Sequence, residues 1–244
     1  MDTANLIIGY VDNGSPTEAT FYALLAGVVP SLIWLAFWLL EDRRHPEPKR
    51  FLLLTFLLGM GTVPIALYFQ RLADGYFPFG SFALLFVWAA SEEILKFLAA
   101  GVTLIKRVNN EPVDSMVYLV TAALGYAALE NAFFLYGPIG AGDISTSITA
   151  GNFRFIGSTL VHVLSSAAIG IFLAYAYCRP KWKKVPAIFV GVLCASVLHT
   201  IYNTLILNTE INFFIIFGGI WAGIAVVLVF FEIVKRKNPY CRVK

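Results

Sequence analysis

Long runs of hydrophobic residues, separated by short polar segments, occupy most of this chain. A helix needs about 20 apolar residues to cross the hydrocarbon core of a bilayer. The longest run exceeds this length, so we expect that helix to tilt or to extend beyond the bilayer. The pattern predicts seven membrane-spanning helices, near residues 20–40, 51–70, 79–105, 115–136, 157–178, 185–207 and 211–234.

Composition supports a membrane protein and excludes a soluble one. Hydrophobic residues make up 59% of the 244 residues and charged residues only 14%, whereas soluble domains contain about 25% charged residues. The predicted helices use almost the whole length, so residues 1–244 form a single all-α membrane domain in contact with the lipid bilayer. The small net charge of +3, carried in short separate clusters, does not indicate nucleic-acid binding.

Basic residues between the predicted helices indicate how the bundle is oriented. Of the 18 Lys and Arg residues, only Arg71 and Arg154 fall in connections on one side, and Lys96 falls inside a helix. The rest lie in alternate connections and in the C-terminal tail. Since positive residues favour the cytosolic side, we expect the N-terminus outside and the C-terminus in the cytosol. One polar segment on the outer side, residues 137–156, is expected to be a connector rather than a mobile element near the opening of a site.

The third predicted helix contains three charged residues within five positions, Glu92, Glu93 and Lys96. Each charge at membrane depth costs at least about 2.5–3.5 kcal/mol. Lys96 follows the two glutamates by four and three residues, so it can form an ion pair on the same helix face. The simplest interpretation is a neutralised charge cluster that fixes helix packing.

Other predicted helices also carry polar residues, which favours a shared site over isolated packing contacts. The fourth contains Glu130 and Asn131, the fifth His162, and the sixth His199 and Asn203. Except for Glu92 and Glu93, which lie deeper, the members of this group are expected within about two turns of the outer helix ends. We therefore expect one converging polar site that opens toward the non-cytosolic side.

These residue types are suited to hydrolysis of a peptide bond. A carboxylate in a low-dielectric site can act as general base on water, and histidine can share the proton transfers. An asparagine amide can stabilise the oxyanion. One glutamate with two histidines is also a ligand set of catalytic zinc. If a metal such as zinc is bound, the candidate ligands are Glu130, His162 and His199.

At these residues the sequence resembles the PrsW family of intramembrane proteases, within the wider group of CAAX-processing and bacteriocin-immunity membrane proteases. The resemblance rests on five segments in family order, within a motif-bearing core of about residues 79–207: EEILK at 92–96, EPVD at 111–114, GYAALEN at 125–131, Arg154 with His162, and HTIYN at 199–203.

The resemblance implies a glutamic-type or metal-dependent endopeptidase in a bacterial or archaeal plasma membrane. It implies membrane-anchored, single-span substrates similar to anti-sigma factors. The catalytic candidates are Glu92, Glu93, Lys96, Glu130, Asn131, His162, His199 and Asn203. Two alternatives stay open on the sequence alone. Intramembrane Glu, Lys and His also build the relays of ion- or proton-coupled transporters, and a relative without catalytic activity could act as a membrane scaffold.

Overall fold

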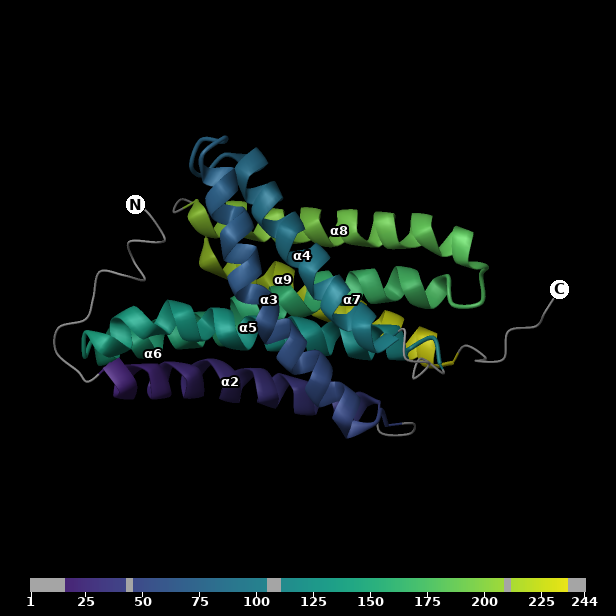
Figure 1. The fold of residues 1–244 in the computed structure, drawn as a ribbon, viewed down its shortest axis with the longest axis horizontal. Helices are drawn as coiled ribbons and strands as arrows, with labels where there is room; N and C mark the ends of the chain where they lie inside the picture. Colours follow the sequence, from purple (N-terminus) through teal and green to yellow (C-terminus); the bar gives the residue numbers. More distant parts are fainter. Residues whose placement is uncertain (1–15, 43–45, 105–110, 209–211, 237–244) are drawn as a thin grey trace.

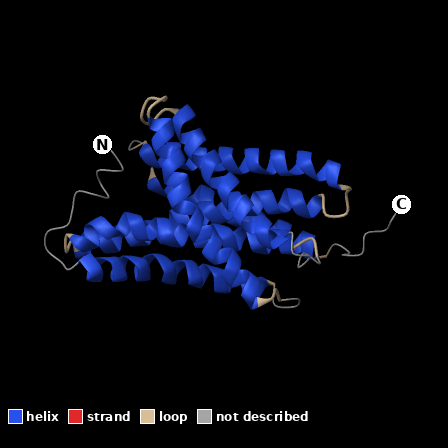
Figure 2. Cartoon of the chain, in the orientation of Figure 1, coloured by secondary structure: helices blue, strands red, loops and turns tan. Residues whose placement is uncertain are grey.

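The structure is a computed structural model that describes residues 16–42, 46–104, 111–208 and 212–236. Within these ranges every regular element is a helix (Figure 2). The helices are α2 (Pro16–Glu41), α3 (Lys49–Asp74), α4 (Phe82–Leu104), α5 (Asp114–Gly140), α6 (Ile144–Phe153), the π-helical turn η1 (Arg154–Ser158), α7 (Thr159–Tyr175), α8 (Lys181–Leu207) and α9 (Phe213–Lys235).

The expected all-α membrane bundle is confirmed. Six continuous helical segments are long and apolar enough to cross a membrane. The remaining expected helix is α4, which is 23 residues long but carries Glu92, Glu93 and Lys96 in its middle. The expectation of a connector at 137–156 was wrong. There α5 continues to Gly140, and α6 runs through η1 into α7, so that one helical segment spans Ile144–Tyr175.

Helix α5 forms the centre of the bundle. Its residues are buried along most of its length, and it packs against α2, α3 and α7. In Figure 1, α3 and α4 run obliquely across the other long helices. Close approach depends on glycine: a Cβ added at Gly59 of α3 would lie 2.1 Å from the Ala122 carbonyl oxygen, and one added at Gly125 of α5 would lie 2.0 Å from the Phe56 carbonyl oxygen. Small residues of this kind are what brings membrane helices into backbone contact.

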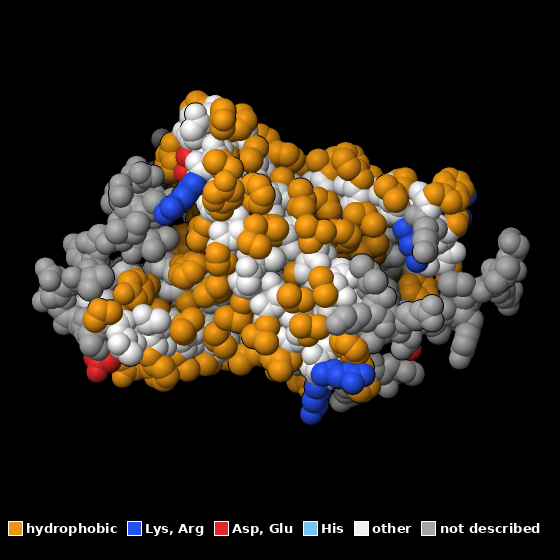
Figure 3. All heavy atoms as spheres, viewed as in Figure 1, with side chains coloured by type: hydrophobic (Ala, Val, Ile, Leu, Met, Phe, Trp, Pro, Cys, Tyr) orange, Lys and Arg blue, Asp and Glu red, His pale blue; other side chains and the backbone are white. Residues whose placement is uncertain are grey.

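The helices alternate in direction, so the helix ends that flank the basic connections gather at one end of the bundle (Figure 1). On the face shown in Figure 3, hydrophobic side chains cover the middle and Lys and Arg side chains lie toward the periphery. This distribution is that of a bundle surrounded by lipid. Which end faces the cytosol stays a prediction of the charge pattern.

The glycine contacts between α3 and α5 generate a prediction about stability. Gly59→Ala should destabilise the protein by about 1–3 kcal/mol, because the added Cβ meets backbone that cannot move independently. The matched control is Gly61→Ala, where nothing lies within 4 Å of the added Cβ. There alanine should be neutral or stabilising, since it favours helix more than glycine does. Unfolding of both variants in detergent micelles measures the difference. Equal stability of the two would contradict this packing.

Candidate active site

Polar side chains from α4, α5, α7 and α8 meet in the interior of the bundle. Glu93, which is completely buried, receives the largest set of contacts. The Lys96 Nζ donates to Glu93 Oε1 at 2.6 Å, and His199 Nδ1 lies 2.9 Å from the same oxygen. Ser166 donates its hydroxyl proton to Glu93 Oε2 at 3.2 Å. Both oxygens of this carboxylate are therefore occupied, and its charge is neutralised by a buried ammonium group.

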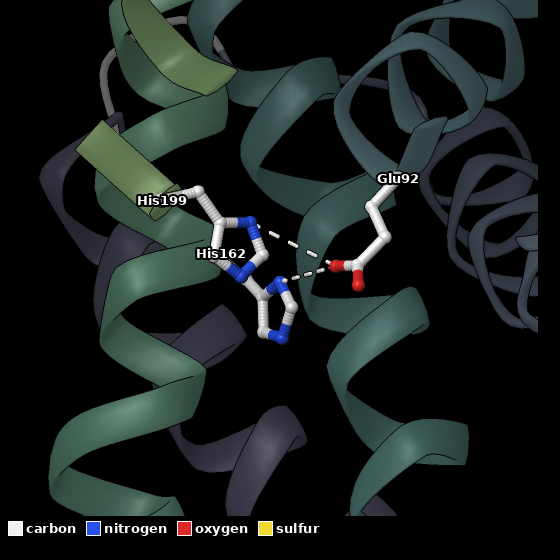
Figure 4. A group of neighbouring side chains, drawn as sticks. All are labelled: Glu92, His162 and His199. Carbon is white, nitrogen blue, oxygen red and sulfur yellow. Dashed lines mark ion pairs between the residues drawn. The ribbon is translucent and has the colours of Figure 1, made fainter. Parts of the chain in front are cut away.

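Glu92 has a different environment, although it precedes Glu93 on the same helix and is also buried. The side-chain amide of Gln70, on α3, donates to Glu92 Oε1 at 2.8 Å. Glu92 Oε2 is buried and makes no hydrogen bond to any residue that the structure describes. This oxygen lies 3.8 Å from His162 Nδ1 and 3.7 Å from His199 Nδ1 (Figure 4). Both distances are too long for hydrogen bonds, so the oxygen points between two imidazoles without bonding to either.

His162, on α7, is held at both ring nitrogens. Its Nε2 lies 3.1 Å from Glu130 Oε2, and its Nδ1 lies 3.0 Å from Lys96 Nζ. Lysine can only donate and an ionised glutamate can only accept, so a neutral ring with its proton on Nε2 satisfies both contacts. The imidazole planes of His162 and His199 are nearly perpendicular, with ring centroids 5.0 Å apart.

Arg154 organises the outer part of the site. Its guanidinium pairs with Glu130 and donates to the side-chain oxygen of Asn131. The Asn131 amide in turn donates to Thr159 Oγ1 at 3.0 Å. The Arg154 and Glu130 side chains are 15% and 16% exposed, whereas the His162 side chain is 1% exposed. This ion pair is therefore the more accessible edge of the site.

The π-turn η1 lies where the helix passes the site. A π-turn contains more residues than an α-turn, so it rotates the preceding residues relative to those that follow. Arg154 is the first residue of η1 and faces α5, while His162 follows in α7 and faces α4. The turn leaves the Phe155 carbonyl available to the Trp34 indole N–H of α2, at 3.0 Å.

Comparison with known proteins agrees with this arrangement. The sequence model of a family described as "PrsW family intramembrane metalloprotease" matches residues 47–234, which include α3–α9 almost completely and every side chain of the site.

This chain belongs to the PrsW family. It is 28% identical over 193 residues to the Protease PrsW of Geobacillus kaustophilus, covering 78% of this chain and 82% of that protein. It is 26% identical over 186 residues to the Protease PrsW of Bacillus subtilis, covering 75% and 82%, and 27% identical over 191 residues to that of Clostridioides difficile, covering 75% and 78%. No solved structure matches the chain. The chain is thus an intramembrane protease, with several helices crossing the cell membrane.

The structure brings together seven of the eight residues predicted for the PrsW site: Glu92, Glu93, Lys96, Glu130, Asn131, His162 and His199. Asn203, the eighth, lies one turn beyond His199 and makes no hydrogen bond within the described part of the chain. The EPVD segment is separate from this group. Its Asp114 begins α5, 16 residues before Glu130, and accepts from the Glu111 backbone N–H at 2.8 Å.

Gln70 contacts the PrsW site but was not predicted from the sequence. It falls at the end of an apolar run and next to Arg71, where a polar residue normally marks the membrane interface. Glu130 lies farther from the end of its helix than expected. It is ten residues before the end of α5, or about 15 Å along the helix axis, because α5 continues past the predicted boundary.

A metal-ligand group is present, but its carboxylate differs from the one expected. Ligand atoms of Glu92, His162 and His199 all lie within 4.8 Å of one another, whereas the sequence analysis named Glu130 with the two histidines. Glu130 is instead paired with Arg154. Donors around a tetrahedral zinc lie about 3.4 Å apart, which is close to the separations around Glu92 Oε2, and this unpartnered oxygen also suits a cation. The spacing of the donors therefore suits a divalent metal, but the His162 Nδ1 lone pair is occupied by Lys96 Nζ at 3.0 Å.

The unequal environments of the two glutamates generate a prediction about stability. Glu93→Gln should lower the free energy of unfolding by about 3–5 kcal/mol, because Lys96 is left buried without its counter-charge. Glu92→Gln is the matched control and should cost clearly less, since its side-chain oxygen can still accept from Gln70. Denaturation in mixed micelles measures both. A loss for Glu92→Gln as large as that for Glu93→Gln would contradict the assignment of the ion pair.

Proposed function

We propose that this protein is an endopeptidase that cleaves single-span, membrane-anchored proteins, with Glu92 as the base that activates water. The observation that supports this role is a buried Glu92 oxygen that makes no hydrogen bond within the described part of the chain and points between His162 and His199. A water molecule between these groups can donate to the carboxylate, and Glu92 would take its proton as the water attacks the peptide carbonyl.

Glu93 would support the reaction without taking part in the proton transfer. Its two oxygens are bound by Lys96, His199 and Ser166, which leaves it poorly placed to accept a further proton. It would hold His199 in orientation and stabilise the positively charged form of the imidazole, as an acidic partner does in other hydrolytic sites. His199 could then protonate the leaving amine. Glu93 is therefore a positioning residue in this proposal.

Asn203 and His162 would stabilise the transition state. The Asn203 amide lies on α8 one turn from His199 and is not engaged by another described side chain. It can donate to the oxyanion that forms on the substrate carbonyl. His162 is fixed by Glu130 and Lys96, so it would form one wall of the water site. Lys96 would place its positive charge near the developing negative charge.

The family description raises a metal-dependent alternative. Glu92, His162 and His199 would hold the ion, which would polarise the carbonyl and lower the pKa of a bound water. The contact between Lys96 Nζ and His162 Nδ1 favours the metal-free version, because it uses the lone pair that would bind the ion. A metal at His162 would have to displace a buried ammonium group that is 3.0 Å away.

The likeness to proteins named Protease PrsW supports peptide hydrolysis over the transporter and the inert scaffold. The substrate class rests on two features. The candidate residues lie on helices long and apolar enough to cross a membrane or packed among such helices, and family resemblance implies substrates similar to anti-sigma factors. Opening of the site toward the non-cytosolic side follows from the charge pattern of the connections.

Glu92→Gln should reduce the rate of cleavage about 10²–10⁴-fold, the range expected for loss of a general base. His199→Ala and Asn203→Ala should each reduce cleavage by a smaller factor. The assay uses purified protein in liposomes with a library of single-span substrates, and gel mobility reports the products. Glu232→Gln makes the same chemical change at an exposed position of α9 and should leave cleavage unchanged.

Undiminished cleavage by the folded Glu92→Gln protein would overturn the proposal that Glu92 is the base. Undiminished cleavage by the folded Glu93→Gln and His199→Ala proteins as well would overturn the whole assignment of the site. Flux of protons or ions across the same liposomes without any peptide product would instead favour the transporter.

A chelator should leave the activity of the purified protein unchanged, because the proposed base needs no metal. The measurement compares cleavage before and after dialysis against a strong zinc chelator. Loss of activity that returns on addition of zinc, together with a lower zinc content in His162→Ala, would overturn the metal-free version. It would assign Glu92, His162 and His199 as ligands.

A further inference from the structure

Gln70 of α3 contacts Glu92 from a helix that carries none of the predicted site residues. Its Nε2 donates to Glu92 Oε1 at 2.8 Å. A carboxylate oxygen can only accept, so the amide must present its N–H group to this contact. The hydrogen bond therefore fixes which of the two Glu92 oxygens faces α3 and which faces the histidines.

The Gln70 backbone is held by the same face of α4 that carries Glu92. The Trp88 indole N–H donates to the Gln70 carbonyl oxygen at 3.3 Å. Trp88 precedes Glu92 by four residues, so the two side chains lie one above the other on α4. Gln70 is thus bound twice, through its main chain by Trp88 and through its side chain by Glu92. This double contact fixes α3 against α4 at the level of the site.

The chemistry of the donor distinguishes the two adjacent glutamates. Glu93 is bound by an ammonium group, which compensates its negative charge. Glu92 is bound by a neutral amide, which orients the carboxylate but leaves its charge for the reaction. Lys96, the cation on the same helix as the two glutamates, bonds to Glu93 and His162 and not to Glu92 within the described part of the chain.

We propose that Gln70 is a positioning residue of this protease, which acts through Glu92 by holding one carboxylate oxygen so that the other faces His162 and His199. This inference rests on the proposed role of Glu92 as the base. Trp88 supports Gln70 from α4. Loss of the amide would let the carboxylate rotate or turn toward a buried cation, and both changes withdraw the basic oxygen from the water site.

The test compares steady-state cleavage of a single-span substrate by the full-length protein and by Gln70→Met in liposomes. Methionine has a similar length and no donor. The expected result is a fall in kcat of about 10- to 100-fold, the range typical for loss of a group that orients an active-site side chain, with KM changed less than twofold. A role in packing alone would lower the thermal stability and leave kcat of the folded protein at the wild-type value.

Thr62→Val is the matched control. Thr62 is also a half-buried polar residue of α3, and its hydroxyl bonds only to the Gly59 carbonyl of the same helix. The kcat of Thr62→Val should equal that of the wild type.

Trp88→Phe keeps an aromatic ring but removes the indole donor. It should also lower kcat, by a smaller factor than Gln70→Met does. It also tests the inference if Gln70→Met does not fold.

Two failures can be told apart by including Glu92→Gln in the same assay. A fully active Glu92→Gln protein would overturn the proposed function itself. An inactive Glu92→Gln protein together with wild-type kcat in Gln70→Met and Trp88→Phe would overturn only the role of Gln70.

Discussion

The structure depends on one constraint, the cost of placing ionised side chains inside a membrane bundle. Two glutamates and one lysine within five residues of α4 would be unfavourable against lipid. They become tolerable because α4 is surrounded at this level by α3, α5, α7 and α8, and each partner helix supplies a polar group. The bundle therefore has to close around α4 for α4 to be stable in the membrane, and the closed arrangement is the site.

Close packing and polar pairing support each other. Gly59 and Gly125 let α3 and α5 approach until their backbones touch. Further along α3, polar contacts fix the same helix against α4, where Gln70 donates to Glu92 and accepts from the Trp88 indole. Helix α3 is thus held against α5 by small residues and against α4 by hydrogen bonds at the level of the site.

Much of the fold could be predicted from the spacing of hydrophobic residues. A membrane helix makes its backbone hydrogen bonds internally, so it can be recognised as a long run of apolar residues. The same pattern could not show that residues 137–156 are mostly helical. Their Gly, Ser and Thr content is typical of loops, but here Asp143 caps α6 by accepting from the Thr146 backbone N–H at 2.9 Å, and the helix continues into α7. A prediction from composition alone therefore mistakes polar residues at the end of a helix for a connecting loop.

Seven of the eight candidate residues lie together, as the sequence predicted, whereas the pairing among them was not predicted and their catalytic roles stay predictions. Charged residues and histidines are rare inside apolar runs because their burial in a membrane is unfavourable. This cost alone was enough to select Glu92, Glu93, His162 and His199 from the sequence. Which carboxylate pairs with which base depends on helix rotation, and a difference of one residue turns a side chain by about 100°. Glu93 therefore faces Lys96 and His199, while Glu92 faces α3.

The difference in environment between these neighbours is the basis for the separate roles that we propose for them. His199 Nδ1 lies near both carboxylates, 2.9 Å from Glu93 Oε1 and 3.7 Å from Glu92 Oε2, but Lys96 pairs with Glu93. In the proposed mechanism the glutamate paired with the cation positions His199, and the glutamate that accepts from the neutral amide of Gln70 takes the proton from water. One lysine and one amide beside an EE pair would in this way leave a single reactive carboxylate.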